Sequence, residues 1–181
     1  MKYILVLCIS LLVSCASEGQ APTTVPTLAP VATPMPITPT LGNCAFVEAT
    51  QNLPDLTTQV DKAMKELQSD ASGRAEAYGE NCVYAGSGQS VFTAKETDFY
   101  ITANVKNIKD NNELGKWIVS AMTIVNTLPP DSISGPQAGF VEFIFTANDG
   151  RTILRVPINK YKSLPANTSP ADLIKTLFPN P

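Results

Sequence analysis

Prolines near the start of the chain limit which residues can form a packed domain. The segment from Ala16 to Gly42 contains six prolines and six threonines, and no charged residue occurs between Glu18 and Glu48. Each proline removes a backbone donor, and the residue before it is also pushed away from helical geometry. We therefore expect an extended, solvated tether here, followed by a single globular domain at residues 43–181.

The chain begins with the pattern of an export signal. Lys2 is followed by an apolar run from Tyr3 to Leu12, and small residues precede Cys15. A run of about ten apolar residues is too short to span a bilayer, which needs roughly 20. Residues 1–14 are therefore predicted to be a signal peptide, and an uncleaved membrane anchor is the less favoured alternative.

The four residues Leu12-Val13-Ser14-Cys15 resemble the lipobox of bacterial lipoproteins. The resemblance implies cleavage before Cys15 and acylation of that cysteine, so that residues 15–42 would join a lipid anchor to the domain. The expected location is extracytoplasmic, on the cell membrane or the cell surface, with the lipid bilayer as one partner. The resemblance covers only the export signal and implies nothing about the folded domain.

The composition excludes several functions. One of the 13 basic residues, Lys2, is predicted to leave with the signal, so 12 remain against 16 acidic residues and the formal charge is near −4. An acidic chain without a basic patch argues against nucleic acid as a partner. The chain has no histidine, which removes most nucleophile–base pairs and metal sites. We therefore expect no cofactor, no metal and no enzymatic activity.

Two cysteines are expected to pair. Cys8 is predicted to leave with the signal and Cys15 to carry the lipid, so Cys44 and Cys82 remain. In an oxidising compartment such a pair normally forms a disulfide. A metal pair or a reactive thiol is a poorer interpretation, because two sulfurs alone make an incomplete zinc site. The predicted bridge closes a loop of about 39 residues, which is worth roughly 4 kcal/mol by loop-closure entropy.

Hydrophobic spacing predicts three helices. Apolar residues recur at helical intervals in residues 53–67 and 110–128, and again in a short segment at residues 169–178. Ser169 is the expected N-cap of the last helix, with Pro170 in its first turn. Asp110 and Glu113 form a pair that resembles a capping box at the start of the second helix. Trp117 lies in the apolar stripe of that helix, so we interpret it as core packing and not as a ligand platform.

Strands are predicted from Tyr78 to Ala85 and from Ser90 to Val105, joined by a glycine-rich turn. The apolar residues of the second strand change phase between residues 94 and 99, which predicts a β-bulge. Because bulges often lie beside functional sites, Glu96 and Asp98 are the most interesting carboxylates in the chain. A solvated strand edge is the simpler interpretation of the same two residues.

A second hairpin is predicted from residues 140–146 and 152–158, with Asp149 and Gly150 as the turn. Glu142 and Arg155 then lie diagonally across the two strands, near enough to interact. The apolar side chains share the other side, with the expected facing pairs Val141 and Ile158, Phe143 and Val156, and Phe145 and Leu154.

These elements predict an α+β fold of two layers, with an antiparallel four-stranded sheet and helices on one face, in the order α-β-β-α-β-β-α. The other face would be open to solvent. A mixed aromatic and charged sheet face suits binding. The candidates for this binding face are polar or aromatic residues of the predicted strands, namely Tyr84, Glu96, Asp98, Tyr100, Glu142 and Arg155.

The leading functional hypothesis is a non-catalytic, membrane-anchored binding lipoprotein, whose partner is an unidentified protein or small ligand of the cell envelope. One alternative is a carboxylate-dependent cell-envelope hydrolase that uses Glu96, Asp98 or Glu142, which would require two carboxylates to converge in a cleft. Another alternative is an inhibitor of secreted proteins, which would present the loop from Leu128 to Ala138.

Overall fold

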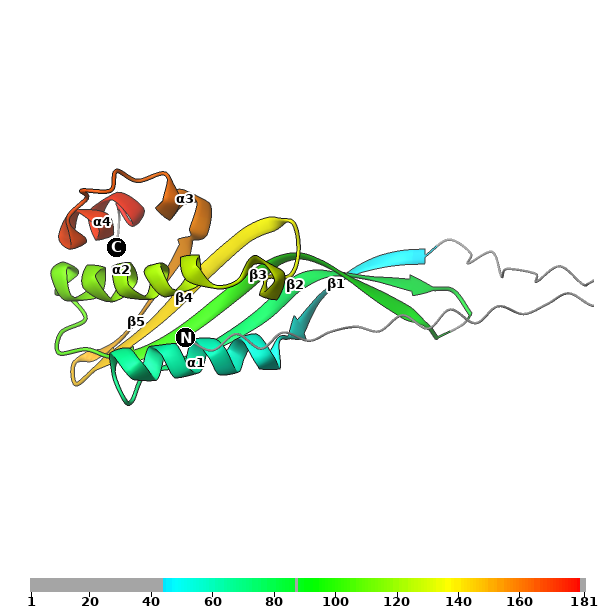
Figure 1. Cartoon of the computed structure of the whole chain (residues 1–181), viewed down its shortest axis with the longest axis horizontal. Helices are drawn as coiled ribbons and strands as arrows, with labels where there is room; N and C mark the ends of the chain where they lie inside the picture. Colours follow the sequence, from blue (N-terminus) through cyan, green and yellow to red (C-terminus); the bar gives the residue numbers. More distant parts are fainter. Residues whose placement is uncertain (1–43, 87, 180–181) are drawn as a thin grey trace, which may run out of the picture. The chain divides into compact units, whose positions relative to one another are not determined.

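The computed structural model describes residues 44–86 and 88–179, which form a mixed α+β fold around one five-stranded sheet (Figure 1). The strands are β1 (Cys44–Asn52), β2 (Ser72–Tyr84), β3 (Ser90–Asn104), β4 (Gln137–Ala147) and β5 (Gly150–Pro157). The helices are α1 (Pro54–Leu67), α2 (Asn111–Thr127), α3 (Ile158–Lys162) and α4 (Pro170–Leu177), with a 3-10 turn, η1 (Pro130–Ser132). None of these helices is long and apolar enough to cross a bilayer. The predicted signal, the lipidated Cys15 and the tether lie outside the described residues.

The prediction of four strands is wrong, because β1 adds a fifth strand at the edge of the sheet. Its neighbouring residues Phe46 and Val47 are 68% and 54% exposed. Since successive side chains of a strand point to opposite faces, both faces of β1 carry exposed apolar groups here. The sequence of this strand therefore lacks the apolar–polar alternation that marks a half-buried strand.

The prediction of an all-antiparallel sheet is also wrong, because β3 and β4 run parallel. Parallel neighbours cannot be joined by a tight turn and need a crossover connection. Helix α2 supplies that crossover between β3 and β4. The strand order is β1-β2-β3-β4-β5, so β3 is the central strand.

The predicted bulge is confirmed in the antiparallel pair of β2 and β3. Tyr78 pairs with Glu96 and Gly79 pairs with Ala94, so Lys95 is the extra residue. The extra residue brings Phe99 onto the same face as Ala94, as the change in apolar phase requires. Helices α1 and α2 lie over this face (Figure 1), and the core cluster packs there.

The second hairpin has the predicted faces but a different register. Val141 pairs with Val156 and Phe143 with Leu154, two residues from the expected partners. Asn148 and Asp149 form the turn, and Gly150 begins β5 with a positive φ of 139°. An offset of two residues leaves every side chain on its face, since the side-chain period of a strand is two. Ile158, which was expected in the strand, begins α3 instead.

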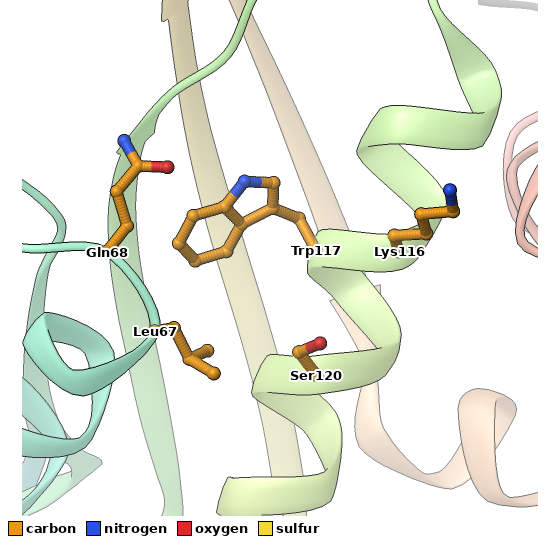
Figure 2. Close-up of a pocket in the computed structure, with 5 residues that line it drawn as sticks. All are labelled: Leu67, Gln68, Lys116, Trp117 and Ser120. Carbon is orange, nitrogen blue, oxygen red and sulfur yellow. The ribbon is translucent and has the colours of Figure 1, made fainter.

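The expected placement of Trp117 in the core is only partly right. The side chain packs against the core and is half-buried. Figure 2 shows its ring beside a surface pocket of about 220 Å³, between the end of α1 and the middle of α2. Because α1 ends at Leu67, no further turn of that helix covers the indole.

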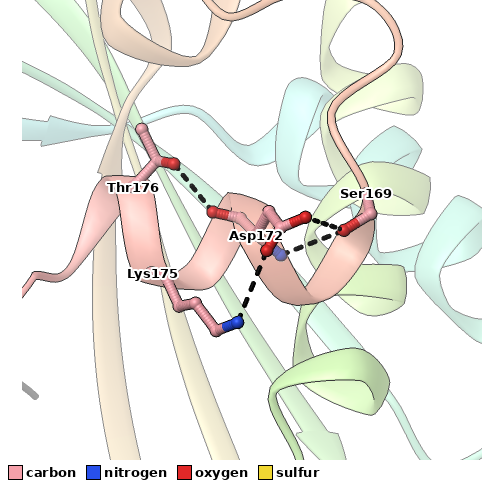
Figure 3. Close-up of polar contacts among 4 residues, drawn as sticks. All are labelled: Ser169, Asp172, Lys175 and Thr176. Atoms are coloured by element: carbon pink, nitrogen blue, oxygen red, sulfur yellow. Dashed lines mark hydrogen bonds and ion pairs between the residues drawn. The ribbon is translucent and has the colours of Figure 1, made fainter.

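Two of the three predicted helices, α2 and α4, are capped by side chains at their starts, whereas α1 has no side-chain cap. Asp110 accepts hydrogen bonds from the backbone N–H groups of Asn112 and Glu113. Glu113 does not complete a capping box, because its carboxylate accepts from the N–H groups of Lys106 and Asn107. At the start of α4, Ser169 Oγ accepts from the N–H of Asp172 at 3.2 Å and donates to its carboxylate at 2.7 Å, while Lys175 approaches the same carboxylate (Figure 3).

Helix α4 reaches α2 through a close backbone approach at Gly115. A Cβ atom on Gly115 would lie 2.0 Å from the carbonyl oxygen of Pro170, well inside contact distance. The atoms that the Cβ would meet belong to the backbone of Pro170, so no flexible side chain could move aside. The docking of α4 therefore depends on a glycine at this position.

We expect Gly115→Ala to lower the free energy of unfolding by about 2 kcal/mol or more, because overpacking forces the two backbones apart. Urea denaturation followed by circular dichroism measures this change. The control is Lys116→Ala at the next, exposed position, which we expect to change stability by less than about 0.5 kcal/mol. Equal stability of the two variants would contradict the close approach.

The predicted disulfide is confirmed between Cys44 and Cys82, with Cα atoms 5.3 Å apart. It joins the first residue of β1 to β2 and closes the chain segment that contains α1.

We expect Cys44→Ser/Cys82→Ser to lower the free energy of unfolding by up to about 4 kcal/mol, because the unfolded chain gains loop entropy. Urea denaturation of the variant should match that of the reduced wild-type protein, and an unchanged midpoint in both would contradict this role.

Candidate functional site

The sheet face opposite α1 and α2 carries a row of charged and aromatic side chains across four strands. Arg74 of β2 pairs with Tyr100 of β3, Tyr100 pairs with Glu142 of β4, and Glu142 pairs with Arg155 of β5. Paired residues of neighbouring strands point to the same face. We call these four residues together with Phe140 the open-face row.

Within the open-face row, two aromatic rings contact each other and a cation lies over each of them. The guanidinium carbon of Arg74 lies 3.7 Å from the centroid of the Tyr100 ring, and that of Arg155 lies 4.2 Å from the Phe140 centroid. The two rings meet edge to face with centroids 5.8 Å apart. Glu142 accepts hydrogen bonds from Arg155 Nη2 at 2.7 Å and Nε at 3.2 Å. Cation–π and charge-assisted contacts of this kind hold long side chains in one arrangement.

A shallow pocket of about 340 Å³ opens beside the row. Its lining residues come from β1, β2, β3, β4 and β5, and they are Thr50, Tyr78, Glu96, Asp98, Tyr100, Phe140 and Arg155. Four of the predicted site residues thus meet in one pocket, namely Glu96, Asp98, Tyr100 and Arg155. Glu142 contacts Arg155 at its margin. Tyr84 lies apart from this pocket, at the end of β2 opposite Cys44.

Asp98 does not lie on a solvated strand edge, which corrects the simpler interpretation of the sequence. It belongs to the central strand, and only 4% of its surface is exposed. The ladder between β3 and β4 breaks at this residue, because Thr97 pairs with Ala138 while Phe99 pairs with Val141. Asp98 Oδ1 accepts the backbone N–H of Phe140 at 3.1 Å, a donor that the broken ladder leaves free.

Gly139 makes room for this carboxylate. A Cβ atom on Gly139 would lie 2.3 Å from Asp98 Oδ1. The neighbouring loop is fixed to the same region, because Thr97 Oγ1 donates to the carbonyl of Ser134 and accepts from its N–H, both at 2.8 Å. The floor of the pocket is therefore an ordered irregularity of the sheet.

Burial raises the pKa of Asp98 to about 6. The N–H of Phe140 opposes this change, and the charge of Glu96 adds to it. A buried carboxylate loses hydration that a single hydrogen bond replaces only in part. Burial also raises the pKa of Tyr100. Asp98 therefore changes charge near neutral pH, while the neighbouring phenol stays protonated there.

The charges around the pocket do not balance. Each nearby cation is paired with a carboxylate, as Arg74 with Glu76, Lys95 with Glu80, and Arg155 with Glu142. Among the described residues, Glu96 and Asp98 have no ion pair. The pocket thus combines aromatic walls with two carboxylates that form no ion pair, and the charge of Arg155 offsets that of Asp98 only in part.

Sequence reasoning missed three of the lining residues. Thr50 was missed together with strand β1. Phe140 lies two residues before Glu142, so the two-residue period of a strand already placed both on one face, and this signal was available. Tyr78 was expected in a strand but was not recognised as part of the site, although it pairs with Glu96.

Comparisons of the chain with protein-family models, with curated proteins and with solved structures found no match. Within residues 44–86 and 88–179, no three or more histidine, cysteine, aspartate or glutamate side chains are grouped so that they could hold a metal ion.

The raised pKa of Asp98 predicts a stability effect with a definite sign. In the folded protein the pKa is above its unfolded value, so ionisation costs stability; this cost is absent below about pH 4 and complete above about pH 6. Asp98→Asn removes the charge and keeps an oxygen for the Phe140 N–H. We expect the variant to be more stable than wild type at pH 7.5 by about 1 to 3 kcal/mol.

Urea denaturation between pH 4 and pH 8 measures this difference, which should shrink towards pH 4. The matched control is Glu66→Gln, which removes one charge from the exposed face of α1. We expect less than about 0.5 kcal/mol from the control at any of these pH values. A destabilised Asp98→Asn at pH 7.5 would show that the carboxylate is needed for the fold itself.

Proposed function

We propose that this protein is a non-catalytic binding lipoprotein, anchored outside the cytoplasm by an acylated Cys15, whose ligand or partner docks on the open face of the sheet. The observation that carries the proposal is the pocket beside the open-face row, where side chains from all five strands meet. The export signal and the lipobox resemblance support the location. The disulfide suits an oxidising compartment.

The arrangement of the open face supports binding. Arg74 and Arg155 are each held by a ring and a carboxylate, so few of these rotamers remain to be ordered when a ligand arrives. Such preorganisation lowers the entropic cost of association. The volume of about 340 Å³ is at the small end of the range for ligand pockets, which suits a small molecule or a single side chain.

A carboxylate-dependent hydrolase is the second candidate. The observation that favours it is the pKa of Asp98, about 6, in a pocket that Glu96 also lines. A raised carboxyl pKa beside a second carboxylate is the pattern of a general acid with its partner. The hydrogen bond from Phe140 gives Asp98 a structural role that a general acid does not need.

The inhibitor alternative has less support. An inhibitor presents a rigid loop that projects into a protease site, whereas the loop between η1 and β4 is tied back to the sheet by Thr97 and Ser134. A Cβ atom on Gly135 would lie 2.3 Å from the backbone of Lys95, so the loop also lies close against β3.

We expect the immobilised full chain to bind a specific component of a cell-envelope extract. The double variant Tyr100→Ala/Arg155→Ala should bind at least ten-fold less of this component, because two anchors of the open-face row are removed. The matched control is Lys62→Ala/Glu66→Ala on the exposed face of α1, which should capture as wild type does. Equal capture by all three proteins would contradict a binding role for the open face.

An assay for reducing sugar tests the hydrolase alternative. Release of reducing sugar from envelope glycans by the wild-type chain, lost in Glu96→Gln and in Asp98→Asn, would favour the hydrolase instead.

A further inference from the structure

We propose that the pocket beside the open-face row binds an alkylammonium group, presented by a small amine or by a lysine side chain of a partner protein. This inference rests on the proposed function and names the chemistry of its ligand. It is carried by three features of the pocket: its two carboxylates without ion pairs, its aromatic walls, and the second oxygen of Asp98.

The charge around the pocket favours a cation. Arg74, Lys95 and Arg155, which lie on strands that line the pocket, already bind carboxylates of the protein. Arg155, the only basic residue among those that line the pocket in the described part of the chain, directs Nε and Nη2 to Glu142. An incoming anion would be repelled by the charges of Glu96 and Asp98, whereas a cation would be attracted to both.

The aromatic walls suit the same ligand. Tyr78, Tyr100 and Phe140 all line the pocket. The guanidinium groups of Arg74 and Arg155 lie over the Tyr100 and Phe140 rings, so a ligand would contact the uncovered parts of these two rings and the ring of Tyr78. Carboxylates beside aromatic rings are the usual surroundings of bound ammonium groups, because the methylene or methyl carbons contact the rings while the charge meets the acid.

The burial and hydrogen bonding of Asp98 support a binding role independently of the charges around the pocket. The residue is more than nine-tenths buried, and its Oδ1 accepts the Phe140 N–H. Its second oxygen, Oδ2, accepts no hydrogen bond from any other described residue and is open to solvent, since no buried side-chain oxygen of the described residues lacks a partner. An asparagine would serve Phe140 equally well without the cost of burying a charge. A carboxylate that costs stability and keeps one oxygen open to the pocket is typical of a binding residue.

The size of the pocket limits the ligand. A volume of about 340 Å³ accommodates a short chain with a charged end, and a polyamine or a sugar chain would extend beyond it. A primary alkylammonium or a methylated one fits the combination of two carboxylates and three rings. A free amine and a lysine side chain offer the same group, so the test must distinguish the two sources.

The experiment is an NMR titration of the ¹⁵N-labelled full chain, in which the amide chemical shifts are recorded as each probe is added. The probes are n-butylammonium, tetramethylammonium and a blocked Ala-Ala-Lys-Ala-Ala peptide, with n-butanol, butyrate and the norleucine peptide as matched controls. We expect saturable shifts in residues 96–100 and 138–142 with at least one cationic probe. The dissociation constant should rise at least ten-fold in Asp98→Asn and stay within two-fold in Glu66→Gln. Preference for the peptide would identify a protein partner, and preference for a free amine would identify a small ligand.

The affinity should also fall at least five-fold from pH 7.5 to pH 5, because protonated Asp98 no longer attracts a cation. Glu96 on β3, Glu76 on β2 and Arg155 on β5 are the charged groups that act on Asp98, and Tyr100 lies beside it. Asp98→Asn should lose most of this pH dependence.

Two results would overturn the inference. One is the absence of saturable shifts with every cationic probe; the other is tighter binding of butyrate or n-butanol in the same residues. In either case the loss of envelope capture in Tyr100→Ala/Arg155→Ala would leave the proposed function standing. Since Asp98→Asn is expected to be more stable than wild type, its loss of binding would not arise from unfolding.

Discussion

The extra residue Lys95 is the constraint on which both faces of the sheet depend. Without it, the apolar residues before and after the bulge would point to opposite faces, and β3 could not serve one core. With it, Phe99 and Ile101 are buried under the helices, and Asp98 and Tyr100 are turned to the open face. The same single residue therefore creates the core and positions the candidate site.

A second irregularity, between β3 and β4, gives the site its chemistry. Asp98 lies opposite two residues of β4, Gly139 and Phe140, and its carboxylate takes the place of a missing ladder acceptor. The bulge and this break are only three residues apart on the central strand. In a regular ladder the N–H of Phe140 would bind a backbone carbonyl. The break leaves this N–H to the carboxylate of Asp98, which is thereby held beside the pocket.

Much of this arrangement could be predicted from local patterns. The helix starts at Asp110 and Ser169, the bulge and the contact between Glu142 and Arg155 all follow from residues close in sequence or from the two-residue strand period, although the two residues were expected to lie diagonally and are directly paired. The parallel pairing of β3 with β4 could not be predicted, because nothing local states which strands become neighbours. Asp98 was expected on a solvated edge for the same reason, since its burial follows from the strand order and not from its surroundings in the sequence.

The two faces of the sheet have separate roles in the energetics. The helix-covered face buries large apolar side chains such as Phe99, Phe143 and Phe145, and this burial is the main source of stability. The open face holds a carboxylate whose ionisation opposes folding at neutral pH. A sheet stabilised from one side can tolerate such a group on the other, because the strands that form the core also fix the side chains of the open face. The affinity of the pocket and the stability of the domain are thus coupled through Asp98, and a cation bound there would offset the cost of its charge.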